Sequence, residues 1–174
     1  MKIFIIEDYR AKAPELKGKK LTDFLVGRCL NMEKAEILRM DGGKPYIEGG
    51  PCFSVSHSGN LFACVVSPDN IGIDIQHKRG VDAVGIARRY FIEEEISRIE
   101  ADSDWFFRIW ARKEAFAKYT GRGLQQIMAK EGVLDRSDVI FIDRMIGDDC
   151  FCSICAGKGG MEDEIQFFGG EQDG

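Results

Sequence analysis

The sequence contains no run of apolar residues long enough to cross a lipid bilayer. Its first residues, MKIFIIEDYR, hold an apolar stretch that is too short for a signal peptide. It has no G-x-S-x-G turn, so the Ser-His neighbours at positions 56 and 57 do not indicate a hydrolase triad. No internal repeat is visible. We therefore expect a cytoplasmic protein that does not enter a membrane.

Paired cysteine motifs of the kind found in structural zinc sites are also missing. Cys150, Cys152 and Cys155 lie close together, but in a strand-like segment with no clear fourth ligand nearby. Thiols in a cytoplasmic chain stay reduced and often serve as small apolar residues. We expect this role for most of the six Cys, with a metal site as the minor alternative.

A chain of 174 residues with 44% hydrophobic and 30% charged residues fits one domain or two small, closely packed halves. Residues 131–174 hold 3 Lys and Arg against 11 Asp and Glu, a net charge of −8, and the rest of the chain carries +3. The acidic end argues against a nucleic-acid-binding protein. Basic clusters elsewhere either face an acidic partner or are solvated surface: Lys17-Lys19-Lys20, Lys78-Arg79, Arg88-Arg89 and Arg108-Arg112-Lys113.

Hydrophobic periodicity predicts strands and helices intermixed without a regular βαβ rhythm, which favours the α+β class. The expected strands are 2–6, 51–58, 61–67 and 71–76, with a closing hairpin from 139–143 and 150–156. The expected helices are 19–40, one or two pieces within 83–100, and Trp105 to Tyr119. We expect Asp102 or Ser103 to cap the last helix at its start, Gly121 to end it, and the tail from Met161 to fray.

The last of these helices places Trp110, Glu114 and Lys118 four residues apart, on one line along its surface. A carboxylate one turn from an ammonium group suits phosphate chemistry, because the carboxylate can hold a divalent cation and the Lys can meet a phosphate oxygen. Taken alone, such a pair is more often a solvated surface ion pair.

Three other segments carry polar groups in places where chemistry is expected. Lys44 lies on a turn made rigid by Pro45, as a phosphate contact would need, although a plain surface turn explains it equally well. Ser56 and His57 lie near a strand end where Gly59 permits an anion-binding loop, or simply a capped turn. Asp74, between two Ile residues on a strand, needs a partner, which is a cation or a hydrogen-bond donor.

Together these motifs carry a resemblance. GKPY (43–46), FSVSHSGN (53–60), GIDIQ (72–76) and WARKEAFAKYTGRGL (110–124) occur in the order and character of the Sfp-type 4'-phosphopantetheinyl transferases. The matching segments span residues 43–123, about half of the chain. Four motifs in one order are far more specific than any one of them.

The resemblance implies a fold of two pseudo-symmetric α/β halves, here residues 1–68 and 71–174, with the active site at their interface. It implies an enzyme that moves the phosphopantetheine arm of coenzyme A to a Ser of an apo acyl or peptidyl carrier protein. The reaction depends on Mg²⁺, with Mn²⁺ as an alternative, and releases adenosine 3',5'-bisphosphate. We expect a monomer that meets an acidic carrier protein and binds neither nucleic acid nor membrane.

The resemblance also assigns roles to residues of this sequence. Asp74 and Glu114 resemble the metal ligands. Because the incoming Ser must lose a proton, we expect Glu114 to take it, directly or through water. Lys118 resembles the Lys that meets the pyrophosphate. The remaining matches are phosphate contacts at Ser56 and His57, and the adenylate-side turn at Lys44 and Pro45.

The sequence departs from the family pattern at Gln76, where the motif usually ends in Glu. An amide oxygen can still coordinate Mg²⁺ directly or through water, but the site has one negative charge fewer, so we expect weaker metal binding. The basic candidates for contact with the 3'-phosphate of coenzyme A are Arg10, Lys17, Lys19, Lys20 and Arg28. The alternative functions are a coenzyme A-binding relative without transfer activity and a structural protein with surface ion pairs.

Overall fold

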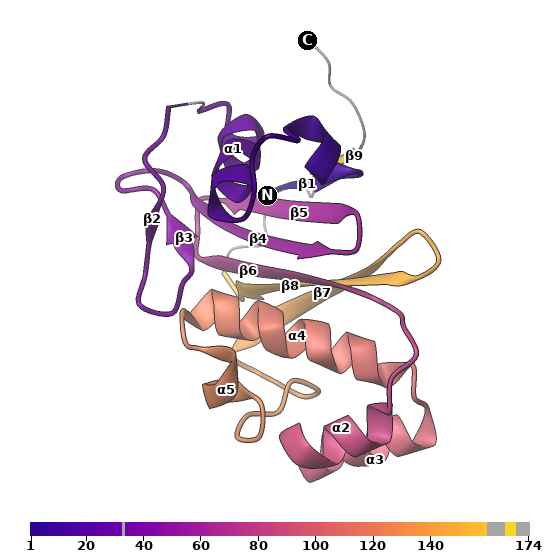
Figure 1. The fold of residues 1–174 in the computed structure, drawn as a ribbon. Coiled ribbons are helices and arrows are strands. Elements are labelled where there is room, and N and C mark those ends of the chain that lie inside the picture. Colours follow the sequence, from indigo (N-terminus) through magenta and orange to yellow (C-terminus); the bar gives the residue numbers. More distant parts are fainter. Residues whose placement is uncertain (33, 160–165, 170–174) are drawn as a thin grey trace.

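The computed structural model describes residues 1–32, 34–159 and 166–169, which form a mixed α+β fold (Figure 1). Its strands are β1 (Lys2–Ile6), β2 (Leu38–Arg39), β3 (Pro45–Tyr46), β4 (Cys52–Ser58), β5 (Leu61–Ser67), β6 (Ile71–His77), β7 (Val139–Ile146), β8 (Cys150–Gly157) and β9 (Gln166–Gly169). Its helices are a 3₁₀ turn η1 (Tyr9–Lys12), α1 (Lys19–Leu30), α2 (Ala83–Tyr90), α3 (Glu93–Ala101), α4 (Trp105–Thr120) and α5 (Leu124–Ile127).

Two larger sheets form the centre of the molecule. The first has the strand order β4-β5-β1-β9, in which β9 runs parallel to β1 and the other neighbours are antiparallel. The second has the order β6-β8-β7 and is antiparallel throughout. Strands β2 and β3 form a short hairpin that belongs to neither sheet. This hairpin places the GKPY turn beside the C-terminal end of α4 (Figure 1).

The two sheets lie between two helical layers. Helix α1 covers the outer face of the first sheet, where Leu25 and Val26 pack with Phe53 and Phe62. Helix α4 covers the outer face of the second sheet (Figure 1). The inner faces of the two sheets share an aliphatic core, which includes Ile3, Val65, Ile71, Ile73, Ile75 and Ile154. Side chains alternate between the two faces of strand β6. Its three Ile residues therefore face this core, and Asp74 faces α4.

Strand β4 is joined to strand β6 by side chains in place of a backbone ladder. Three Ser hydroxyls of β4, on alternate residues, accept hydrogen bonds from backbone N–H groups of β6. The pairs are Ser54 with Ile73 (3.1 Å), Ser56 with Ile75 (3.4 Å) and Ser58 with His77 (3.1 Å). Because the numbering rises along both strands, β4 and β6 run parallel, and the alternating Ser residues of FSVSHS join the two sheets.

Helix α4 approaches β6 closely because position 72 is Gly. A Cβ atom there would lie 2.0 Å from the carbonyl oxygen of Ala115 and 2.6 Å from the backbone nitrogen of Tyr119. The glycine of the GIDIQ motif therefore lets the helix backbone rest on the strand, which brings Asp74 next to the side chains of α4.

The helix expected over residues 19–40 is shorter, and this prediction was wrong in its second half. Helix α1 ends at Leu30, because Asn31 adopts a left-handed conformation (φ 53°) and its N–H bonds back to the carbonyls of Arg28 and Gly27. Leu38 and Arg39 then pair with Tyr46 and Pro45 as strands. A left-handed Asn is a common helix end, and it interrupts an apolar pattern that by itself would continue.

Two other expectations need correction. Residues 166–169, expected to fray, form β9, and Lys2 pairs with Gln166; residues 161–165 and 170–174 lie outside the described part. Asp104 rather than Asp102 or Ser103 precedes the first turn of α4, without a side-chain cap, while the carboxylate of Asp102 accepts the N–H of Asp104. Gly121 ends α4 with φ 71°, as predicted.

The Cys residues of strand β8 are part of the core, as expected. Cys150 and Cys152 face the aliphatic core between the sheets, and Cys155 faces α4. Burial raises the pKa of each of these thiols to about 12, so they stay protonated. Within the described ranges, all six Cys are free, and no helix is long and apolar enough to span a membrane.

Replacing Ser54 by Ala tests the side-chain junction between the sheets. The N–H of Ile73 would lose its acceptor in a buried place, so we expect the free energy of unfolding to fall by about 1–3 kcal/mol. Urea unfolding followed by circular dichroism measures it. Ser97→Ala, on the exposed face of α3, is the matched control and should change stability by less than about 0.5 kcal/mol. If Ser54→Ala and Ser97→Ala were equally stable, the Ser54 hydrogen bond would not contribute to joining the two sheets.

Candidate active site

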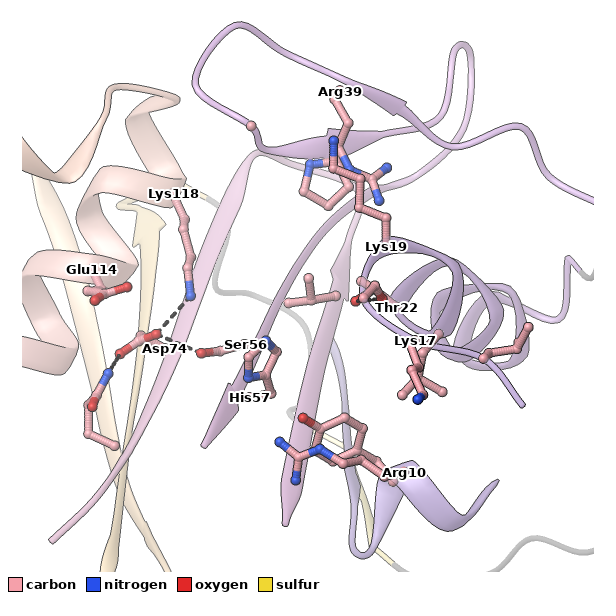
Figure 2. Close-up of a pocket in the computed structure, with 18 of the residues that line it drawn as sticks. Arg10, Lys17, Lys19, Thr22, Arg39, Ser56, His57, Asp74, Glu114 and Lys118 are labelled. Carbon is pink, nitrogen blue, oxygen red and sulfur yellow. Dashed lines mark hydrogen bonds and ion pairs between the residues drawn. The ribbon is translucent and has the colours of Figure 1, made fainter. Parts of the chain in front are cut away.

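A cavity of about 940 Å³ lies over strands β4 and β6, with α4 on one side and η1, α1 and the β2–β3 hairpin on the other. One wall comes from β6 and α4, with Asp74, Gln76, Glu114 and Lys118 (Figure 2). The opposite wall comes from η1, α1 and the β2–β3 hairpin, with Arg10, Lys17, Gly18, Lys19, Thr22, Arg39 and Pro45, and Ser56 and His57 of β4 lie between the walls. The cavity is thus acidic on one side and basic on the other.

Asp74 is the centre of the acidic side, and it is almost fully buried, with 1% of its surface exposed. Its Oδ1 accepts hydrogen bonds from the Ser56 hydroxyl (2.6 Å) and from Lys118 Nζ (2.8 Å), and its Oδ2 accepts one from Gln76 Nε2 (2.8 Å). Lys118 Nζ also donates to the carbonyl of Ile73 (2.9 Å). A buried carboxylate with one cation and two neutral donors is well satisfied.

Glu114 lies one helical turn before Lys118, and its carboxylate faces the cavity (Figure 2). Its Oε1 accepts a hydrogen bond from the indole N–H of Trp110 (2.9 Å). Burial and the nearby Asp74 carboxylate raise the pKa of Glu114, against the opposing effects of Lys118 and of the Trp110 hydrogen bond. Glu114 is therefore more basic than an ordinary carboxylate.

The acidic side has the donor set that a hard divalent cation prefers. Asp74 and Glu114 lie on one wall, and the single positive charge of Lys118 balances only part of their two negative charges. The repulsion between the two carboxylates contributes to the raised pKa of Glu114. The amide of Gln76 lies beside them with its Nε2 directed at Asp74, so its oxygen would face a cation there only after the amide turns. Among the described residues, no group of three or more His, Cys, Asp or Glu is arranged to hold a metal ion. The residues present fit Mg²⁺ through oxygen atoms and bound water.

The basic side holds several cations that point into the cavity (Figure 2). Lys17 and Lys19 are exposed at the start of α1, and neither has an ion-pair partner among the described residues. Arg10 lies over the ring of Tyr9 (4.6 Å to the centroid) and donates to the carbonyl of Gly59 (2.8 Å). Three of the five predicted N-terminal cations thus line the cavity, whereas Lys20 and Arg28 are not among its lining residues.

Sequence reasoning missed Arg39, which also lines the cavity. It lies on β2, inside the range that the apolar pattern assigned to a helix, and it forms an ion pair with Asp23 of α1. The signal that points to it is the pairing of Leu38 and Arg39 with the GKPY turn, which the sequence alone does not reveal.

Ser56 and His57 occupy different sides of the same strand. The Ser56 hydroxyl donates to Asp74 and accepts from the N–H of Ile75, so its single proton is directed at a carboxylate. The ring of His57 stacks on Tyr9 (5.9 Å between centroids) and borders the cavity. Of the two, only His57 presents a donor that is free to turn toward an anion in the cavity.

Lys44 and Pro45 lie on the β2–β3 hairpin, but they are placed differently. Pro45 lines the main cavity, whereas Lys44 lines a smaller adjoining pocket of about 290 Å³. Lys44 Nζ donates to Asn70 Oδ1 (2.6 Å) and to the carbonyl of Ile71 (3.0 Å), and burial lowers its pKa. Its side chain thus connects the hairpin to the segment that joins the two sheets.

The expectation of a basic surface cluster that includes Lys113 was wrong for that residue. Lys113 and Glu95 form an ion pair of 2.8 Å in which both side chains are 0% exposed. Lys113 also donates to the carbonyls of Met128 and Glu131, and Glu95 accepts the N–H of Val133. A paired, hydrogen-bonded Lys can be buried, and here it fixes α3 and the segment after α5 against α4.

Comparison with known proteins agrees with this geometry. Residues 70–154, which include strand β6 and helix α4, match the model of the 4'-phosphopantetheinyl transferase superfamily. The transferase AcpT of Salmonella typhi is 33% identical over 138 residues, which are 71% of this chain and 70% of AcpT. The chain belongs to the 4'-phosphopantetheinyl transferase superfamily.

Other superfamily members are similar over a smaller share. A 4'-phosphopantetheinyl transferase of Bacillus subtilis is 40% identical over 89 residues, 47% of this chain and 39% of the relative. The transferase Sfp of Bacillus subtilis strain 168 is 33% identical over 118 residues, 63% of this chain and 52% of Sfp. The chain thus spans about half the length of the first curated relatives it matches.

The electrostatics of Glu114 predict how stability depends on pH. Because the pKa of Glu114 is raised in the folded protein, the folded state favours the protonated acid, and ionisation opposes folding as pH rises through that pKa. Glu114→Gln removes this effect. Without Mg²⁺, the variant should be more stable than the wild type at about pH 8 and should lose this advantage at about pH 4.

Chemical denaturation at the two pH values measures the difference. Glu48→Gln, at an exposed turn, is the control and should show no such pH-dependent gain. A Glu114→Gln variant that is less stable than the wild type at high pH would contradict the electrostatic account.

Proposed function

We propose that this protein transfers the phosphopantetheine arm of coenzyme A to a Ser of an apo carrier protein, with Mg²⁺. The single observation that carries the proposal is the cavity with Asp74, Glu114 and Lys118 on one wall and basic side chains on the other. Coenzyme A has a pyrophosphate in its middle and a 3'-phosphate at its nucleotide end. Such a molecule suits a site with a cation-binding pair and a separate basic wall. The names of the similar proteins support the same activity.

Each wall of the cavity has a proposed role. Asp74 and Glu114 would hold Mg²⁺, with Gln76 as a weak ligand, direct or through water. Lys118 would meet the pyrophosphate; it now pairs with Asp74 at 2.8 Å, a partner that Mg²⁺ would take over in part. The basic wall would bind the nucleotide end through Arg10, Lys17 and Lys19, with Pro45 of the hairpin and with His57 between the walls. Lys44, in the adjoining pocket, would contribute after releasing Asn70 and Ile71. Ser56, which donates to Asp74, would reach a phosphate after its hydroxyl turns.

The chemical step consists of one bond formed and one broken. The carrier Ser oxygen bonds to the phosphorus that bears the pantetheine arm, and the bond from that phosphorus to the bridging oxygen breaks. Adenosine 3',5'-bisphosphate leaves with the electron pair, and the Ser proton passes to Glu114. A carboxylate made more basic by burial is suited to that role. When bound, Mg²⁺ supplies charge stabilisation for the phosphate oxygens.

We also propose that the chain consists of two related halves, residues 1–68 and 71–174. The support is the repeated order of elements, β1-α1-β4-β5 and β6-α4-β7-β8, with the third strand of each set between the other two. β9 crosses from the second half to the sheet of the first. Because both walls of the cavity come from one chain, a monomer would carry a complete site.

A transfer assay tests the function. The protein is incubated with coenzyme A, Mg²⁺ and several purified apo carrier proteins of acidic surface, and each carrier is weighed by mass spectrometry. We expect the mass of one phosphopantetheine to be added to at least one carrier. Glu114→Ala should lower the rate by at least about 100-fold, because the proton acceptor is lost, while circular dichroism shows an intact fold.

Two outcomes would contradict parts of this proposal. Coenzyme A binding without transfer to any carrier would favour the alternative, a binding relative without transferase activity, to which the neutral Gln76 points. Full activity of Glu114→Ala would remove Glu114 from the mechanism and leave the transferase assignment in place.

Gln76→Glu tests the metal role separately. A third carboxylate beside Asp74 should lower the Mg²⁺ concentration for half activity by about tenfold, because the charge of the ligand set largely decides affinity for hard cations. Titration of the transfer rate with Mg²⁺ measures it. Gln126→Glu adds the same charge at an exposed position of α5 and should leave the titration unchanged. An unchanged or higher Mg²⁺ requirement for Gln76→Glu would contradict the role given to this position.

A further inference from the structure

We propose that Trp110 is a positioning residue whose indole N–H holds the Glu114 carboxylate toward the cavity. The inference rests on the proposed function and adds to it, since Trp110 does not itself line the cavity and reaches it only through its contact with Glu114. It goes beyond a role as a hydrophobic anchor, which the size of the side chain alone would suggest.

The contact itself is specific. Trp110 Nε1 donates to Glu114 Oε1 at 2.9 Å, from one turn before it on the same helix. An indole N–H is a donor only, so it can neither take a proton nor bind a cation. It can therefore orient the carboxylate without competing for the roles proposed for Glu114.

The indole is held in place by an aromatic cluster of Phe91, Phe106 and Trp110. The Trp110 ring centroid lies 6.1 Å from that of Phe91 and 5.6 Å from that of Phe106, and the two Phe rings stack at 5.8 Å. Both Phe side chains are buried. The N–H direction is thus set by packing in the core and not by a mobile surface side chain.

Glu114 needs such a partner because its other neighbours do not hold it. Asp74 repels its carboxylate, and Lys118 directs its ammonium group to Asp74 and to the carbonyl of Ile73. Among the described residues, Trp110 is the only hydrogen-bond donor to Glu114. Without this donor, repulsion from Asp74 would turn a long side chain toward solvent.

Two substitutions separate hydrogen bonding from packing. Trp110→Phe keeps an aromatic six-membered ring in the cluster and has no N–H. Trp110→His loses the larger ring but keeps a five-membered ring whose Nε2 occupies the same ring position as the indole nitrogen. A packing role predicts that Phe is the better replacement in every assay. A positioning role predicts that Phe is better for stability and His is better for the function of Glu114.

The measurements are the free energy of unfolding, the affinity for Mn²⁺ in the presence of coenzyme A by electron paramagnetic resonance, and kcat of transfer. For Trp110→Phe we expect Mn²⁺ affinity and kcat to fall about 10- to 100-fold, as for other residues that orient metal ligands. Trp110→His should recover most of that loss while being the less stable variant. Trp105→Phe, on the same helix, is the matched control and should change neither affinity nor kcat more than about twofold.

A double substitution shows whether Trp110 acts through Glu114. In a Glu114→Gln background, Trp110→Phe should lower Mn²⁺ affinity by less than about twofold more, because the carboxylate that it orients is already absent. A full, additive loss would overturn the proposal, as would Trp110→Phe values equal to those of Trp105→Phe. A wild-type protein that binds Mn²⁺ and coenzyme A but transfers nothing would instead refute the proposed function, and the Mn²⁺ series would still test the role of Trp110.

Discussion

The placement of the site depends on the hydrogen bonds between three Ser hydroxyls of β4 and the backbone of β6. A backbone ladder would bring two strands to the usual spacing within one sheet, whereas an inserted side chain keeps them further apart and lets each belong to its own sheet. The alternation of β4 then sends Phe53 and Val55 toward the core under α1, and His57 toward Tyr9 of η1. One strand thereby joins the sheets through its Ser residues and also borders the cavity with Val55, Ser56 and His57.

Helix α4 shows how one segment serves stability and chemistry at once. Its Lys113 is committed to a buried pair with Glu95, and the next residue, Glu114, faces the cavity. Neighbours on a helix point about 100° apart, so the two charges belong to different environments although they are adjacent in sequence. In the Lys-Glu dipeptide, Lys113 thus anchors the helix in the core, and Glu114 faces the cavity.

The sequence predicted most strands, the course of α4 and the residues of the acidic wall, because strong alternation and specific motifs mark those segments. The sequence-based predictions were wrong where backbone conformations or contacts of the folded protein override the local pattern of apolar residues. The apolar pattern of α1 continued past Asn31, whose left-handed conformation is a backbone choice that the pattern does not record. Burial of Lys113 required Glu95 of α3, a partner from another helix. The position of Arg39 required the β2–β3 hairpin, a local pairing that the apolar pattern does not mark.

The parallel pairing of β1 with β9 has a consequence for how the protein is made. Lys2 pairs with Gln166, so strand β1 gains its second neighbour only after every element from η1 to β8 has been made. Until then one edge of β1 carries unpaired N–H and carbonyl groups, which can recruit a strand from another chain. During synthesis on a ribosome, this edge of β1 stays unpaired until residues 166–169 have been made, whereas strands joined by a short turn can pair soon after they are made.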